Sequence, residues 1–209
     1  MWRLVRLLLI LNFEIGLLTG CVPSTTYRLK NSSTASISAV GKESLEDKIR
    51  KQKILLPGET TLIGQWNLLT IKTNQNRSYS FFLPDRILKW VPRELPDGRF
   101  RYDLSEHVGD SLSWKANPPS LEPIISWREI TLEAGKSKYL PTASVGFPLF
   151  PIENLGHLES AEKAFFNRQR TDIFRVGREL ENMMTNNPET ADKYEPINWS
   201  QLNRVFSRP

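Results

Sequence analysis

Short alternating runs of apolar and polar residues fill the chain from residue 36 to residue 150. The runs NLLTIKT and RSYSFFLP are rich in β-branched and aromatic residues, and the polar residues NQN between them suit a hairpin loop. Pro57-Gly58, Asp97-Gly98 and Ala134-Gly135-Lys136 mark further turns, because glycine tolerates a positive φ. Strands at a spacing of roughly 8–12 residues predict a β-sandwich or a barrel.

The pattern changes near the C-terminus. Residues 141–157 carry three prolines, which predicts an irregular packed connection because proline cannot donate to a sheet ladder. From residue 158 to about residue 185, apolar side chains recur at three- and four-residue steps, as on one face of a helix. The polar residues 167–172 and Gly177 interrupt this stripe, so one helix or two with a break are both open.

The helical stripe needs an apolar surface to cover it, and so does the short stripe in the tail INWSQLNRVF. Both can pack on the protein's own sheet, or one of them can dock on another protein of a complex. The polar segment SLEDKIRKQ near residues 44–52 is open between a short helix and an inserted loop.

The first twenty residues have the three parts of a secretory signal. Arg3 and Arg6 form a positive start, an apolar stretch runs from residue 7 to residue 18, and small residues follow. The apolar stretch is shorter than the roughly 20 residues that a membrane-spanning helix needs, and it contains Asn12 and Glu14. We therefore expect residues 1–20 to be a cleaved signal peptide.

The segment Leu18-Thr19-Gly20-Cys21 resembles the lipobox of bacterial lipoproteins. The resemblance implies that Leu18, Thr19 and Gly20 are recognised by the signal peptidase and that Cys21 is lipidated and becomes the first residue of the mature chain. The alternatives are an uncleaved anchor and an ordinary signal with a chance cysteine. Several acyl chains hold a protein on a membrane stably, whereas one binds only marginally.

Two consequences follow from this resemblance. Cys21 is the only cysteine, so the mature chain would have no thiol for disulfides, metals or catalysis. The residue after it is Val22 rather than Asp, which by resemblance points to the outer membrane, facing the periplasm, in a Gram-negative host.

We thus predict four segments: a signal peptide over 1–20, a lipidated tether and entry to the first strand over 21–35, a β-rich domain over 36–150, and a helical extension with a tail over 151–209. The stretch LKNSSTASISAV…ILLPGETTLIG…LTIKT…RSYSFFLP broadly resembles immunoglobulin-like or transthyretin-like envelope modules. The expected fold is therefore a mainly β protein, a sandwich of that kind with a C-terminal α-helical extension.

Composition narrows the choice of partners. With 39% apolar residues the chain is globular. Residues 1–20 hold two of its 28 basic and one of its 23 acidic residues, so the net charge of the mature chain is +4. That excess is too small for a nucleic-acid-binding face. We expect no nucleic-acid partner and no cofactor, because the chain also lacks a glycine-rich phosphate loop.

The densest polar cluster is DLSEHVGD, with Asp103, Glu106, His107 and Asp110. Carboxylates and an imidazole can ligate a divalent cation, although this spacing matches no known loop and a solvated turn between strands is the simpler interpretation. No G-x-S-x-G elbow marks a nucleophilic serine. An enzyme is therefore less favoured than a binding protein.

Tryptophans offer the candidate partner contacts, because they are enriched at interaction hot spots. We select Trp90 and Trp199 as the more exposed ones, together with Phe206 in the tail. The first functional hypothesis is a lipid-anchored envelope protein that acts as a binding or scaffold component, as in secretion, conjugation or pilus assemblies. The second is a surface-anchored hydrolase or ligand-binding lipoprotein that acts on envelope glycans or peptidoglycan.

Overall fold

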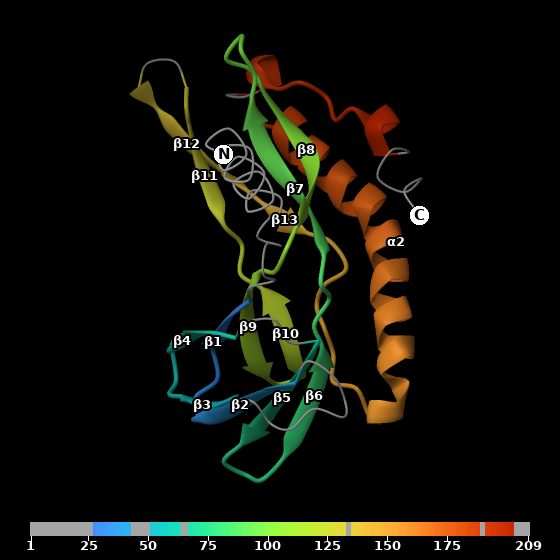
Figure 1. Cartoon of the computed structure of the whole chain (residues 1–209). Helices are drawn as coiled ribbons and strands as arrows, with labels where there is room; N and C mark the ends of the chain where they lie inside the picture. Colours follow the sequence, from blue (N-terminus) through green and yellow to red (C-terminus); the bar gives the residue numbers. More distant parts are fainter. Residues whose placement is uncertain (1–26, 43–50, 64–66, 133–134, 189–190, 203–209) are drawn as a thin grey trace, which may run out of the picture.

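A computed structural model describes residues 27–42, 51–63, 67–132, 135–188 and 191–202. The fold is mainly β with one long C-terminal α-helix, which confirms the predicted fold class (Figure 1). The strands are β1 (Arg28–Asn31), β2 (Ile37–Lys42), β3 (Lys51–Leu55), β4 (Thr60–Leu62), β5 (Leu68–Thr73), β6 (Ser78–Phe82), β7 (Ile87–Glu94), β8 (Phe100–His107), β9 (Ser111–Ala116), β10 (Pro119–Pro123), β11 (Trp127–Thr131), β12 (Ser137–Pro141) and β13 (Ala143–Ser144). The helix is α2 (Leu158–Thr185), and short 3-10 turns occupy Leu155–His157, Ala191–Lys193 and Trp199–Gln201.

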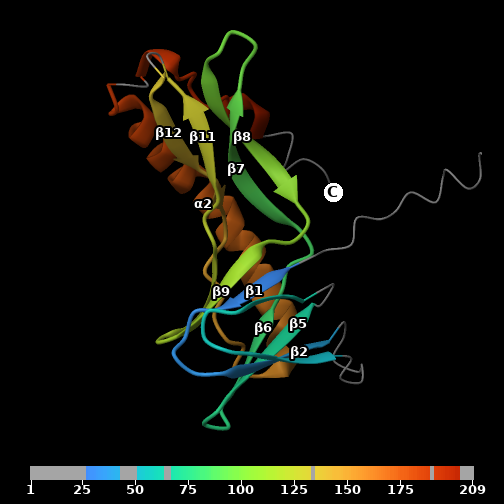
Figure 2. The same cartoon turned by 90° about the vertical axis from the view of Figure 1, so that its left-hand side faces the viewer.

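A β-sandwich forms the lower half of the molecule in Figures 1 and 2. One sheet has the strand order β10-β9-β1-β4 and the other β3-β2-β5-β6, with β1 parallel to β9 and every other pair antiparallel. Side chains from both sheets share one core, as period-2 alternation requires. Leu29, Ala39, Ile71, Phe81 and Leu112 are fully buried in it.

The predicted turns are confirmed. Gly58 and Gly98 lie at φ +80°, the left-handed conformation that glycine adopts readily, between β3 and β4 and between β7 and β8. The NQN loop joins β5 to β6, with Asn76 at φ +57°, a value that asparagine tolerates better than most residues.

A second β layer lies above the sandwich. The long hairpin of β7 and β8, joined by β13, and the hairpin of β11 and β12 surround a second core that also includes α2 and the tail. The sequence predicts one β-rich domain over 36–150, but the structure divides these strands between two cores. The first strand begins at Arg28, within the predicted entry segment 21–35, and β1 is a central strand of its sheet.

Helix α2 is continuous and packs on the protein's own strands. Phe165 lies in the lower core, whereas Ile173, Leu180 and Met184 lie in the upper one. The 28 residues span about 42 Å, so the helix runs along both halves of the molecule (Figure 1). The polar residues 167–172 do not break it, since Gln169 and Asp172 are buried on the same face.

Residues 141–157 form the packed connection that their prolines predict, with β13 as a two-residue strand. Val145, Phe147 and Leu149 are buried in it. Gly146 lies at φ +86°, and a Cβ there would come within 2.9 Å of the Phe165 ring, so only glycine lets this segment pass beneath α2.

Several predictions concern residues outside the described ranges: the signal peptide, the lipobox with Leu18, Thr19, Gly20 and Cys21, most of the polar segment 44–52, and Phe206. Within the described residues, no helix combines the length and the apolar content needed to cross a bilayer.

Candidate functional site: a pocket at the turn end of the sandwich

The prediction that Trp90 is an exposed partner contact is wrong. Its side chain is 1% exposed and points from β7 into the upper core, where the indole Nε1 donates to the carbonyl of Ile173 at 3.2 Å. Lys89 and Val91 suggest a surface strand in the sequence, but alternation turns them to the opposite face of the sheet from Trp90.

Trp199 is half-buried and belongs to the same core. Its ring meets Trp90 edge to face at 5.8 Å and stacks on Phe174 at 5.8 Å, and its Nε1 donates to Glu181. The tail therefore covers the protein's own helix and strands.

The four residues of the predicted metal cluster do not converge. Asp103 pairs with Arg93 and Arg101, and Glu106, which alternation puts on the other face of β8, pairs with Arg86. Among the described residues, no group of three or more His, Cys, Asp or Glu side chains is arranged to hold a metal ion. The cluster is not a turn either, because Asp103 to His107 lie within β8.

Asp110 instead joins the two halves of the molecule. Its carboxylate accepts from Lys89 Nζ at 2.6 Å, from Ser144 Oγ at 2.7 Å and from its neighbouring backbone N–H at 2.7 Å. These side chains come from β7, β13 and the link between β8 and β9, and both members of the ion pair are largely buried. Removing one partner from such a pair leaves an unpaired buried charge.

His107 lies beside this ion pair. Burial lowers the pKa of His107 below 6.5, and the positive charge of Lys89 lowers it further, while Asp110 acts in the opposite direction. In the described part of the chain, no hydrogen bond links a serine hydroxyl to His107 or to the exposed His157. The histidines thus offer no triad geometry there.

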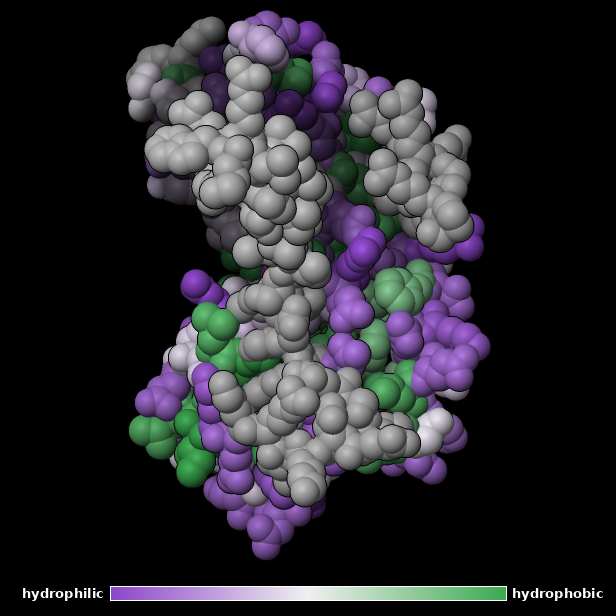
Figure 3. Space-filling view, viewed as in Figure 1, coloured by the Kyte–Doolittle hydropathy of each residue, from purple (hydrophilic) through white to green (hydrophobic). Residues whose placement is uncertain are grey.

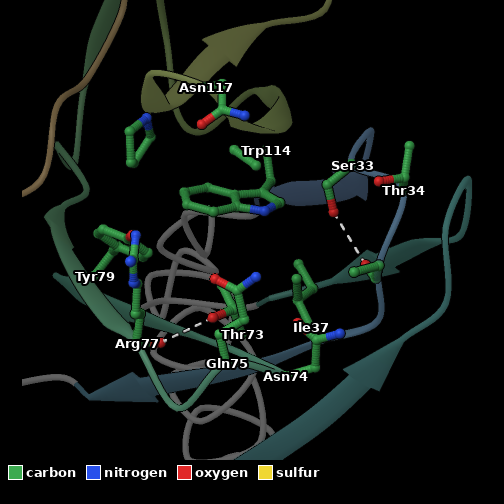
Figure 4. Close-up of a pocket in the computed structure, with 13 residues that line it drawn as sticks. Ser33, Thr34, Ile37, Thr73, Asn74, Gln75, Arg77, Tyr79, Trp114 and Asn117 are labelled. Atoms are coloured by element: carbon green, nitrogen blue, oxygen red, sulfur yellow. Dashed lines mark hydrogen bonds between the residues drawn. The ribbon is translucent and has the colours of Figure 1, made fainter.

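The best-formed polar site lies at the end of the sandwich where three turns meet (Figure 4). We call it the end pocket. It measures about 300 Å³ and is lined by residues 33–35 from the β1–β2 turn, residues 73–75 and 77 from the β5–β6 turn, and residues 116, 117 and 119 from the β9–β10 turn, together with Ile37, Tyr79 and Trp114.

The buried side chain of Asn31 builds the first of these turns. Its Nδ2 donates to the carbonyls of Ala35 and Leu55 at 2.9 and 3.1 Å, and its Oδ1 accepts from the backbone N–H and the hydroxyl of Ser33. An asparagine bonded to a backbone group two residues ahead is a common way to fix a turn. This side of the pocket is therefore preorganised.

Aromatic rings form the floor of the end pocket. Trp114 lies 5.6 Å from Tyr79 and 5.8 Å, edge to face, from Phe81. The Trp114 ring is fully buried, yet its Nε1 has no hydrogen-bond partner among the described residues. In Figure 4 this nitrogen lies on the side of the ring near Ser33, over the space bounded below by Thr73 and Gln75.

The rim of the end pocket is polar and carries one charge. Asn74, Gln75 and Asn117 supply amide groups. Among the described residues of the lining, Arg77 is the only charged side chain, and none carries a carboxylate or an imidazole. Sequence reasoning identified NQN only as a hairpin loop. It missed the pocket because its three turns lie about 40 residues apart in the chain and meet only in the folded sandwich.

Two apolar surfaces are also present. A groove of about 360 Å³ runs beside α2 and includes Ile124, Ile125 and Met183. Ile54, Leu56 and Leu62 are exposed in or next to β3 and β4. In the lower left of Figure 3, hydrophobic surface lies among hydrophilic residues.

Comparison with known proteins adds no relative to this description: no family model, no curated protein and no solved structure matches the chain.

Proposed function

We propose that this protein is a lipid-anchored binding protein of the bacterial cell envelope, held by lipid on Cys21. In a Gram-negative host it faces the periplasm from the outer membrane. The observation that carries the proposal is the Leu18-Thr19-Gly20-Cys21 motif, which lies at the end of a signal-like segment and holds the only cysteine.

The start of the fold suits a short anchor. Tyr27, six residues after Cys21, is fully buried, and its hydroxyl donates to the carbonyl of Pro84 at 2.5 Å. Six extended residues reach about 20 Å at most, so a lipid on Cys21 would hold the sandwich close to the membrane surface.

The end pocket favours binding over catalysis. It offers amides, hydroxyls, one guanidinium and aromatic rings, which fix and orient a ligand, whereas the carboxylates and imidazoles that usually act as general acid or base are missing from the described residues of its lining. The exposed apolar groove and the β3–β4 edge give the same protein surfaces for an envelope partner, as a scaffold component would need.

Replacement of the lipidated cysteine tests the anchor. In a bacterium that processes lipoproteins, the native chain should incorporate a labelled fatty acid, lose about 20 residues and fractionate with membranes. Cys21→Ser should remain an unlabelled precursor. Thr19→Ala, which keeps a small residue in the motif, is the matched control and should be processed normally. Normal maturation and membrane retention of Cys21→Ser would overturn the proposal.

A further inference from the structure

We propose that the end pocket binds one unit of an acidic saccharide, a sugar ring that bears a carboxylate. An acidic saccharide would then be the ligand of the proposed binding protein. Only the compartment in which the protein meets this ligand rests on the proposed function. The pocket itself is tested by binding in solution, so failure of the anchor and failure of the pocket give different results.

The indole of Trp114 has an unmade hydrogen bond beside the end pocket. A buried donor without an acceptor is costly, so native structures rarely leave one unless a ligand or water completes it. The Trp114 Nε1 is buried, has no partner among the described residues, and belongs to a ring that lines the cavity. A hydroxyl or carboxylate oxygen entering the end pocket would accept this bond after a small shift of the rim.

The polar rim of the end pocket matches a sugar. Asn74, Gln75 and Asn117 present donors and acceptors together, which is what vicinal hydroxyl groups require. These three side chains make no hydrogen bond with the described residues, so a ligand need not displace an internal partner. The half-buried ring of Tyr79 supplies an apolar face at the same site.

A single positive charge, that of Arg77, lies on the rim of the end pocket. Arg77 has no ion-pair partner among the described residues, and a guanidinium binds a carboxylate through two parallel hydrogen bonds. One cation in a pocket of about 300 Å³ suits one acidic ring, because small-molecule pockets begin at about this volume. A nucleic acid would need a broader basic face.

The end pocket lies away from the point where the tether enters the sandwich, which favours a ligand that lies away from the membrane. β1 (Arg28–Asn31) leads from Tyr27, where the tether enters, toward the turn that carries Ser33 at the pocket. At the rise of a strand its four residues span about 13 Å. The pocket thus lies at the end of the sandwich opposite to Tyr27 and can meet polymers of the envelope.

The experiment follows the Trp indole signals in an NMR titration. The full-length protein, labelled with ¹⁵N and purified in detergent, is titrated with galacturonic acid and, separately, with galactose, which differs by the carboxylate. N-acetylmuramic acid and N-acetylglucosamine form a second pair of this kind. We expect an acidic sugar to shift the Trp114 Nε1–H signal with millimolar affinity, and its neutral counterpart to bind about tenfold more weakly.

Variants locate the binding. Arg77→Gln should weaken the acidic sugar about tenfold and leave the neutral one unchanged, and Asn117→Ala should weaken both. Arg178→Gln removes the same charge from an exposed position on α2 and should change neither. Trp114→Phe identifies the indole signal, and if that variant does not fold, Arg77→Gln still decides the outcome.

Three results would overturn the proposal. Titration of all four sugars without a shift would show that the end pocket takes no such unit. Binding of the acidic sugars that Arg77→Gln leaves intact would place their site elsewhere. Binding of an acidic peptide with the expected Arg77 dependence, while no sugar binds, would assign the pocket to a different class of ligand.

Discussion

Gly177 lies where α2 meets two tryptophans. In a helix interior, Gly→Ala usually stabilises by about 1 kcal/mol. Here a Cβ would come within 2.6 Å of Trp199 Cη2 and 2.9 Å of Trp90 Cζ2. We predict that Gly177→Ala lowers the free energy of unfolding by about 1–3 kcal/mol, because overpacking outweighs the gain in helix propensity. Urea denaturation measures the change.

The double variant with Trp199→Ala is the control for this effect. Without the Trp199 ring, one of the two close contacts is gone, so Gly177→Ala should cost less in that background than in the native chain. A native-background Gly177→Ala protein that is more stable than the original would show that the tail moves aside and that the close contact has no energetic role.

His107 gives the fold a dependence on pH. Burial and Lys89 lower its pKa below 6.5 in the folded state, so the folded protein holds the imidazole neutral. A group with a lowered pKa contributes stability above its unfolded pKa and loses that contribution as the pH falls through the folded value. We therefore predict that stability declines on acidification from about pH 6.5 downward.

The variant His107→Gln separates this contribution from that of the carboxylates, which also titrate on acidification. Unfolding free energies of both proteins are measured between pH 8 and pH 5, and the difference between them is compared. The native protein should lose more stability over this interval than the variant. Parallel curves would mean that His107 ionises equally easily in the folded and unfolded states.

At the scale of elements, the tail after α2 is part of the upper core. The backbone N–H of Ile197 donates to Glu181 at 2.9 Å, and Ile197 and Leu202 are buried. We predict that Ile197→Ala costs about 2–5 kcal/mol, the range for a large buried aliphatic residue. Ile125→Ala, at a side chain that is 54% exposed, is the matched control and should change stability little. Equal effects would contradict the assignment of the tail to the core.

The elements that could be predicted from the sequence are those fixed by local chemistry. Gly58, Gly98 and the NQN loop mark their turns because backbone conformation limits the residues allowed there. The stripe along α2 follows from its own periodicity. The interruptions at residues 167–172 and at Gly177 left a break in the helix open, but both reflect packing. Polar side chains are buried within residues 167–172, and two tryptophan rings approach Gly177 closely.

The features that could not be predicted from the sequence depend on which faces of the strands and of the helix pack together. Trp90 is flanked by Lys89 and Val91, and only the position of α2 decides which side of β7 is covered. The metal cluster failed for a related reason, since β8 alternates its acidic side chains between two faces. The end pocket draws its lining from two hairpin turns and from the connection between β1 and β2, which lie far apart in the chain, so no window of the sequence contains it.

At the scale of the whole molecule, α2 and Asp110 hold two β layers together. The helix places Phe165 in one core and Ile173 in the other, and the Asp110 carboxylate connects β7, β13 and the chain entering β9. The sandwich therefore has a fixed axis, with the tether at the Tyr27 end and the end pocket at the other. Orientation on a membrane should follow from this axis.

Fluorescence quenching on liposomes tests that orientation. Lipidation would block Cys21, so a cysteine introduced by Arg28→Cys or Gln75→Cys is the only thiol available to a fluorophore. Arg28 is exposed at the start of β1, seven residues after Cys21, whereas Gln75 lies on the pocket rim at the other end of the sandwich. Nitroxide-labelled lipids should quench the label at position 28 more strongly than the label at position 75. Neither label should be quenched in proteins that also carry Cys21→Ser, and stronger quenching at position 75 would mean that the end pocket faces the membrane.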